Sequence, residues 1–401
     1  MAKGTDIPKF GLLNGLKVLG CGVVTAEPYA VDMMAEHGAD VIQIENVKAP
    51  ERTRGNIPAF ASENRNKRTL ALNVPEGKEI FERLLKWADI WVESSKPGMY
   101  PKWGYTDEAV HAINPKLVIV HISGYGQTGD PNYVNRPGMD ASGQAFSGIM
   151  SINGEAGGSP LVSKPGLSDY LTGLYASWAA LAGVYYARET GKGDVIDVSQ
   201  YEPLLRFQSP NIMLYLLKGL QTPRTGNAND TYAGINSYKC KDGAYVMIQV
   251  SGKNVIIAAA QMLGIADHPA LAEGKSLLWG TEEAELMDNA LANFCAEHTV
   301  EEVEAQMSAI KVTCSIVMDY AMMAKNPHII ARNDFIEWYD EHAGQNVKGV
   351  GVFPKVRDNP GQIWRGAPKF GQDSQDIMEE LGFTAEEIDD LCEKQIIGKA
   401  K

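Results

Sequence analysis

The chain has 401 residues, of which 44% are hydrophobic and 22% are charged, and its formal net charge is −13. This length exceeds one typical hydrophobic core and predicts a globular protein of two or more domains. The acidic balance argues against nucleic acid and anionic membranes as partners, so a polyanion could bind only in a local basic pocket.

The first 125 residues alternate β-branched runs with amphipathic helical patterns, which is typical of a parallel, doubly wound sheet. The predicted strands are 16–22, 39–45, 68–74, 88–94 and 116–123. The predicted helices between them are 28–38 and 75–88. We therefore expect an α/β fold with a Rossmann-like parallel sheet.

One acid, Asp169, stands between a Pro/Gly-bearing turn and a long apolar run in SKPGLSDYLTGLYASWAALAGVYY (163–186). Large apolar residues recur there at helical spacing, which predicts a helix buried on most of its faces. They are Leu171, Leu174, Tyr175, Trp178, Leu181 and Tyr185. Asp169 is then either a helix N-cap or a buried carboxylate with a chemical role. A strand at 193–199 and a long helix after Tyr201 are expected to follow.

The middle of the chain has a different character. A loop rich in Thr, Asn and Gly at 221–234 predicts a domain boundary, and 237–250 predicts a hairpin that turns at Asp242–Gly243, with helices to about Met323. We expect a large domain over 1–220 and a small α+β domain over 221–330. We expect the C-terminal segment 331–401, with Trp364 as an anchor, to return to the large domain.

Five scattered cysteines without a Cys-x-x-Cys pair indicate a reducing compartment and exclude a zinc site or a disulfide framework. The seven histidines show no metal-ligand spacing, so no metal is expected. No signal peptide and no run of about 18 apolar residues is found. These features predict a cytoplasmic protein.

Gly20–Cys21–Gly22 follows a strand and precedes a helix, and Glu45 ends the next strand, as in a dinucleotide-binding fingerprint. Thr25 occupies the third position, where close packing requires Gly or Ala. The fingerprint is therefore incomplete, and a NAD-dependent dehydrogenase is kept as an alternative.

Two basic clusters lie near strand ends. NRNKR (64–68) contributes Arg65, Lys67 and Arg68, and SSKPGMYPKWG (94–104) contributes Lys96 and Lys102. Such clusters are either solvated surface charge or a pocket for phosphate groups, which guanidinium and ammonium groups bind through charge-assisted hydrogen bonds.

Several segments in the right order together resemble the class III CoA-transferase family, in particular its carnitine and bile-acid branch. They are GADVIQIEN, NRNKR, NPKLVIVHISGYGQTGDP, QAFSG, SDYLTGL, ETGKGDVIDVSQYE and NPGQIWRGAP. The resemblance implies that Asp169 is the nucleophile, that Lys67, Lys96 and Lys102 contact CoA, and that Asp140 is an active-site neighbour. It also implies an interlocked homodimer whose large domain is built from both chain ends.

The sequence departs from the family pattern at two places. Ala26–Glu27–Pro28 replaces the usual Ala-Gly-Pro, and NANDTYAG replaces the glycine-rich loop of the oxalate branch. A role for that loop in shielding the intermediate is therefore not carried over to this chain.

The implied reaction moves CoA from an acyl-CoA to a free carboxylic acid through an aspartyl mixed anhydride and an aspartyl-CoA thioester. It needs no tightly bound cofactor, because CoA is itself a substrate, and backbone N–H groups at the helix start would stabilise the oxyanions. We expect a betaine acid such as carnitine, crotonobetaine or γ-butyrobetaine, since aromatic faces bind quaternary ammonium groups. The candidate aromatics are Tyr29, Trp103, Tyr232 and Tyr238. A bile acid or another bulky or aryl acid is the alternative.

Overall fold

The computed structural model describes residues 7–399 and separates into two compact units. The first unit contains the chain up to Gly148, Ser163–Ser209 and the chain from His328 onward; the second contains Ile149–Val162 and Pro210–Pro327. The predicted boundaries after 220 and 330 lie near the observed divisions. The short segment 149–162 was expected in the large domain but belongs to the second unit.

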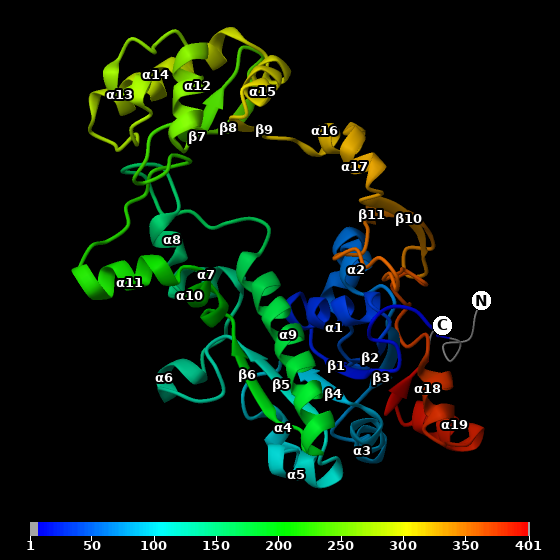
Figure 1. Cartoon of the computed structure of the whole chain (residues 1–401). Coiled ribbons are helices and arrows are strands. Elements are labelled where there is room, and N and C mark those ends of the chain that lie inside the picture. Colours follow the sequence, from blue (N-terminus) through cyan, green and yellow to red (C-terminus); the bar gives the residue numbers. More distant parts are fainter. Residues whose placement is uncertain (1–6, 400–401) are drawn as a thin grey trace. The chain divides into compact units, whose positions relative to one another are not determined.

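A seven-stranded sheet forms the centre of the first unit, with the order β12-β3-β2-β1-β4-β5-β6 (Figure 1). All neighbours pair in parallel except β12, which runs antiparallel to β3. The strands are β1 Lys17–Cys21, β2 Asp40–Glu45, β3 Arg68–Leu72, β4 Ile90–Glu93, β5 Val118–Ser123, β6 Val195–Ser199 and β12 Ile397–Gly398. The order reverses between β1 and β4, and this is the point at which doubly wound sheets bind ligands.

Both faces of the sheet are covered by helices, which explains why the central strands are apolar on both sides. Helices α1 (Ala26–Glu36) and α9 (Leu167–Thr190) pack on one face. Helices α3 (Lys78–Trp87), α5 (Asp107–Ile113), α18 (Ser374–Glu380) and α19 (Ala385–Glu393) contribute to the core on the other.

Helix α9 buries a different face from the one that its sequence predicts. Its small residues, such as Gly173 and Ala176, are buried, whereas Trp178 is 67% exposed and Tyr185 is 72% exposed. A Cβ added at Gly173 would lie 2.7 Å from the Ala26 carbonyl oxygen, so α1 and α9 pack closer than large side chains allow. The prediction that the large residues are buried is wrong for the single chain.

The remaining helices and strands of the first unit are short. They are η1 Arg52–Gly55, α2 Ile57–Glu63, α4 Met99–Lys102, α6 Pro131–Val134, α7 Asp140–Phe146, α10 Glu202–Phe207 and the hairpin β10 Phe335–Asp340 and β11 Gln345–Val350. The one long helix expected after Tyr201 is two helices, because the chain breaks at Gln208, whose Nε2 donates to the Ser147 carbonyl.

The second unit contains a three-stranded antiparallel sheet of β7 Ile235–Lys239, β8 Tyr245–Gln249 and β9 Thr313–Ile316. The predicted hairpin therefore forms as β7–β8, with its turn at Gly243. The helices α8 Ile149–Ile152, α12 Lys253–Met262, α13 Pro269–Glu273, α14 Glu282–Glu297, α15 Val300–Ala309 and α16 Tyr320–Lys325 lie in this unit. Helix α11 (Ser209–Lys218) leads into it, and α17 (Pro327–Ala331) leads out of it.

The C-terminal segment packs against the sheet of the first unit. Strand β12 pairs with β3, and the Asn66 side-chain oxygen accepts a hydrogen bond from the Trp364 backbone N–H at 2.8 Å. The Asp373 carboxylate accepts hydrogen bonds from Thr69 N and the Arg365 guanidinium. The β12–β3 pairing and the contacts of Asn66 and Thr69 join residues about 300 positions apart, and the local pattern of the segment predicted none of its helices or strands.

Candidate active site

A pocket of about 160 Å³ opens at the carboxyl ends of β1, β4 and β5, where the strand order reverses. The loop 23–26 after β1, Ser94 after β4 and 122–124 at the end of β5 line it, together with Asp169 and Gln200. This is the edge at which an open α/β sheet binds its ligands.

Asp140, rather than Asp169, caps helix α9. Its Oδ1 accepts hydrogen bonds from the backbone N–H groups of Ser168 at 2.8 Å and Asp169 at 3.2 Å. Its Oδ2 accepts a bond from Gln144 Nε2 at 2.8 Å, which holds the carboxylate in place. The N-cap interpretation of Asp169 is therefore wrong, because Asp169 is the third residue of α9 and its side chain is left for the pocket.

The Asp169 carboxylate is half-buried, and Gln200 Nε2 donates a hydrogen bond to its Oδ1. Burial and the negative charge of Asp140 raise the pKa of Asp169 to about 6, and the Gln200 hydrogen bond opposes this shift. The carboxyl group is therefore mostly ionised at pH 7 and is more basic than an ordinary aspartate. Sequence reasoning missed Gln200, although it directly follows strand β6 at the same edge of the sheet.

The loop between β1 and α1 is held in a strained conformation beside Asp169. Val24 lines the pocket with a φ of 72°, which is rare for a β-branched residue. The Val24 N–H donates to Glu51 Oε2 at 3.1 Å, and the Glu51 N–H donates to Glu45 Oε2 at 3.2 Å. The carboxylate of Glu51 thus fixes one wall of the pocket.

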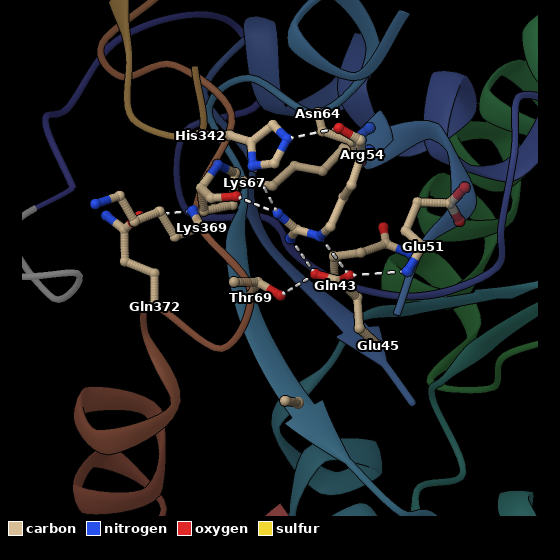
Figure 2. Close-up of polar contacts among 12 residues, drawn as sticks. Gln43, Glu45, Glu51, Arg54, Asn64, Lys67, Thr69, His342, Lys369 and Gln372 are labelled. Carbon is tan, nitrogen blue, oxygen red and sulfur yellow. Dashed lines mark hydrogen bonds and ion pairs between the residues drawn. The ribbon is translucent and has the colours of Figure 1, made fainter. Parts of the chain in front are cut away.

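Lys67 is fully buried in the first unit, and Figure 2 shows its side chain among those of its polar neighbours, such as Asn64. Its Nζ donates to the carbonyl oxygens of Pro28 at 2.8 Å and Glu63 at 2.7 Å and to Asn64 Oδ1 at 3.1 Å. An ammonium group has three donors, so these contacts use all of them. Inside the fold Lys67 joins α1, α2 and the start of β3, and the contact with CoA that the resemblance implies stays a prediction.

The arginines near Lys67 are also buried and paired. Arg65 pairs with Glu36, and Arg68 donates two hydrogen bonds to Asp40 and one to Glu380. Figure 2 shows the equivalent pair between Arg54 and Glu45. The cluster NRNKR is neither a solvated charge run nor an open phosphate pocket, because Arg65 and Arg68 pair with carboxylates and the Lys67 donors bond to carbonyl and amide oxygens inside the fold.

Lys96 and Lys102 have a different environment. Both are exposed in the segment 94–106 that follows β4, and neither forms an ion pair with another residue in the described range 7–399. Lys96 lines a second pocket of about 330 Å³ together with Glu93 at the end of β4, His121 of β5 and Asp197 of β6. Lys102 is the last residue of helix α4 in the same segment.

The four aromatic residues considered for an ammonium group do not share one environment. The Tyr29 ring packs edge-on against Tyr170, with centroids 4.9 Å apart, and Trp103 packs edge-on against Tyr100. In the second unit Tyr238 is buried and donates its hydroxyl to Asp288, whereas Tyr232 is 43% exposed. Tyr238 and Trp103 are thus occupied by packing within their own units.

Within residues 7–399, no group of three or more His, Cys, Asp or Glu side chains is arranged to hold a metal ion. No helix in the same range combines the length and the apolar character needed to cross a bilayer.

A family model described as CoA-transferase family III matches residues 13–374. The chain belongs to this family. It is 41% identical to the bile acid CoA-transferase BaiK of Clostridium scindens, over 98% of this chain and 92% of that protein. The protein is therefore a CoA-transferase, and the dehydrogenase alternative is set aside.

Two solved structures resemble this CoA-transferase in fold. A CAIB/BAIF family protein from Brucella suis is 26% identical over 93% of this chain and 100% of that chain, with a TM-score of 0.80. Rv3272 from Mycobacterium tuberculosis is 20% identical over 92% of this chain and 100% of that chain, with a TM-score of 0.78. The second likeness concerns the fold alone.

Proposed function

We propose that Asp169 is the covalent nucleophile of this CoA-transferase. The observation that carries the proposal is a half-buried carboxylate that faces the pocket at the strand reversal and has no cationic partner in the described chain. A pKa raised to about 6 leaves Asp169 ionised near pH 7 and makes it a stronger nucleophile than an ordinary aspartate.

In the first half of the reaction, an Asp169 carboxylate oxygen attacks the thioester carbonyl, the C–S bond breaks and CoA leaves as a thiolate. The thiolate then attacks the aspartyl carbonyl of the mixed anhydride and releases the first acid as a carboxylate. Asp169 now carries CoA as a thioester. An incoming carboxylate attacks this thioester, and the mirror sequence yields the new acyl-CoA and free Asp169.

Gln200 is the donor that we assign to the developing oxyanion on the aspartyl group. The backbone N–H groups of Ser168 and Asp169, at the start of α9, are already bonded to Asp140. The Gln200 amide already donates a hydrogen bond to the Asp169 carboxylate. It is therefore placed to donate to the oxyanion that forms when the aspartyl carbonyl is attacked. This replaces the expectation that the helix N–H groups serve that role.

Lys96 and Lys102 are the residues that we assign to the phosphates of CoA. They are exposed, unpaired within the described range and carried by the loop that begins at Ser94, a residue of the Asp169 pocket. Exposed ammonium groups bind phosphate at little desolvation cost.

For the acid, we propose a bulky, mainly apolar carboxylic acid of the bile-acid kind. The support is the 41% identity, over nearly the whole chain, to a protein named as a bile acid CoA-transferase. The betaine acid expected from the sequence has no comparable support, because Tyr238 and Trp103 are occupied by packing.

We also propose that the protein works as a homodimer, as the family resemblance implies. The exposed face of α9 supports this proposal, because Trp178, Tyr185 and Tyr186 are 67%, 72% and 48% exposed in the single chain. A helix face that exposes several large aromatic side chains is typical of an interface between chains. Light scattering after size exclusion should give twice the mass of 43.7 kDa, and a monomer would contradict the proposal.

The covalent mechanism is tested by mass spectrometry after incubation with cholyl-CoA and rapid denaturation. We expect a hydroxylamine-sensitive adduct on the peptide that contains Asp169, and none in Asp169→Asn. Free cholate, phenylpropionate and γ-butyrobetaine are then offered with one acyl-CoA donor, and new CoA esters are measured. An adduct on another residue overturns the role of Asp169, whereas an ester of γ-butyrobetaine alone overturns only the choice of acid.

A further inference from the structure

His121 lies in the sheet between two carboxylates of neighbouring strands. On strand β5 it is in register with Glu93 of β4 on one side and with Asp197 of β6 on the other. Its Nδ1 lies 2.6 Å from Glu93 Oε1, and its Nε2 lies 3.0 Å from Asp107 Oδ1. The ring is buried and packs against Trp91.

Both ring nitrogens face carboxylate oxygens, which accept hydrogen bonds and do not donate them when ionised. A neutral imidazole has one N–H and can satisfy one of the two contacts, so with both carboxylates ionised the two contacts are complete only when the ring is an imidazolium. Although burial alone would lower the pKa of His121, the hydrogen bonds and charges of Glu93 and Asp107 raise it.

The two carboxylates stand at opposite ends of the segment 94–106 that carries Lys96 and Lys102. Glu93 precedes the segment, and its Oε2 also accepts from the Ser95 N–H at 2.7 Å. Asp107 follows the segment as the first residue of α5. His121 therefore ties both ends of this segment to one strand of the sheet.

We propose that His121 is a positioning residue that, as an imidazolium bonded to Glu93 and Asp107, holds the segment 94–106 in the conformation that binds CoA. This rests on the proposed role of Lys96 and Lys102. Loss of the proton leaves one nitrogen lone pair facing a carboxylate, which repels it and loosens one end of the segment. The other charged groups that face the same pocket are Asp197 of β6, Glu108 of α5 and Lys96 itself.

The sign of the pH dependence follows from the raised pKa. The two contacts are complete below the pKa of His121 and are lost as the pH rises through it. CoA should therefore bind the wild-type protein more weakly at alkaline pH. A glutamine at 121 carries no titrating charge and can donate to only one carboxylate at a time, so it removes this dependence.

The test is calorimetric titration with free coenzyme A between about pH 6.5 and about pH 9.5, a range that spans the histidine titration. His121→Gln should weaken binding about 3- to 10-fold at neutral pH, and its affinity should no longer fall in the alkaline range relative to wild type. Asp107→Asn changes a carboxylate that is 41% exposed, and it should weaken coenzyme A binding less than His121→Gln does. This second variant tests the same proposal if His121→Gln does not fold. His111→Gln, whose Nε2 contacts only the Leu117 carbonyl among the described residues, is the matched control.

Lys96→Ala and Lys102→Ala separate this proposal from the CoA site on which it rests. Both should weaken coenzyme A at every pH and keep the alkaline loss, because His121 is intact. Wild-type affinity and pH dependence in both His121→Gln and Asp107→Asn would overturn the positioning role alone. Wild-type affinity in both lysine variants would overturn the CoA assignment of the segment and the positioning role with it.

Discussion

Two groups of charged side chains in the first unit are organised in opposite ways. Around Lys67, each cation has a full set of buried partners: Arg65 pairs with Glu36, Arg68 pairs with Asp40, and the three Lys67 donors bond to two carbonyls and an amide oxygen. At the start of α9, by contrast, Asp169 and Asp140 are two carboxylates that share one helix end and have no cationic partner among residues 7–399.

Charged side chains of the first kind stabilise the fold, whereas carboxylates of the second kind are available for a chemical role. A buried charge with a full set of partners is held in one place and cannot react without breaking those contacts. A carboxylate left beside a second carboxylate is destabilised, which raises its pKa and leaves it available to attack. Sequence reasoning placed Lys67 and Asp169 in the same functional site, and in the structure their side chains have these two different environments.

Replacing Asp169 by Asn should have the largest effect, and its effects on activity and stability should be opposite. Transfer should fall on the order of 10⁴-fold or more, because the nucleophile is lost. The free energy of unfolding should rise by up to about 2–3 kcal/mol near pH 7.5, because a carboxyl group with its pKa raised to about 6 is removed. Chromatography of CoA esters measures the first, and urea unfolding measures the second.

The pH dependence of that stability difference follows from the raised pKa. In the wild type, the unfavourable contribution of Asp169 is fully present above about pH 6 and disappears as the pH falls towards 3.8, the ordinary pKa of an aspartate. The difference in unfolding free energy between Asp169→Asn and wild type should therefore shrink from pH 7.5 to pH 5. A constant difference over this range would show that the carboxylate is not destabilised by its surroundings.

Lys67→Met should have the next largest effect, and it should act on stability alone. The change removes the Nζ hydrogen bonds to the carbonyls of Pro28 and Glu63 and to Asn64 Oδ1, together with the buried positive charge, and should cost about 3 kcal/mol. Urea unfolding measures this loss, with the exposed Lys96→Met as the matched control. A drop in coenzyme A affinity with unchanged stability would restore Lys67 to the CoA site.

Asp140→Asn should have the smallest effect on activity and stability. It tests most directly whether a neighbouring carboxylate raises the pKa of Asp169. The amide oxygen can still cap α9, but the negative charge beside Asp169 is removed, so the pKa of Asp169 should fall. Since activity is lost as Asp169 is protonated, the acid limb of kcat/KM should move to lower pH. An unmoved limb would mean that burial alone sets this pKa. Asp140→Ala, which also removes the cap, should in addition lower the unfolding free energy by about 1 kcal/mol.

Much of the sheet was predictable, because local patterns decide it. The predicted strands at 16–22, 39–45 and 116–123 contain β1, β2 and β5, and the hairpin over 237–250 forms as β7–β8. Buried parallel strands are continuous apolar runs, so their signal is present in each short window. The family was also predictable, because several short motifs occur in the right order.

The local pattern could not decide which residues share a site or which face of α9 is buried. That helix is apolar on all sides, so its periodicity does not distinguish the small residues against α1 from the exposed Trp178 and Tyr185. Asp140 and Gln200 reach Asp169 from 29 and 31 positions away, and no local pattern encodes these contacts.

The sequence by itself determined the fold class, the family and Asp169 as the acid at the start of an apolar helix. Only the tertiary structure decided that Asp140 caps that helix, that Gln200 contacts Asp169 and that Lys67 is enclosed by Pro28, Glu63 and Asn64. The physical reason is that a charged side chain is defined by its partners and its burial. Both are set by strands and helices that meet only in the folded chain.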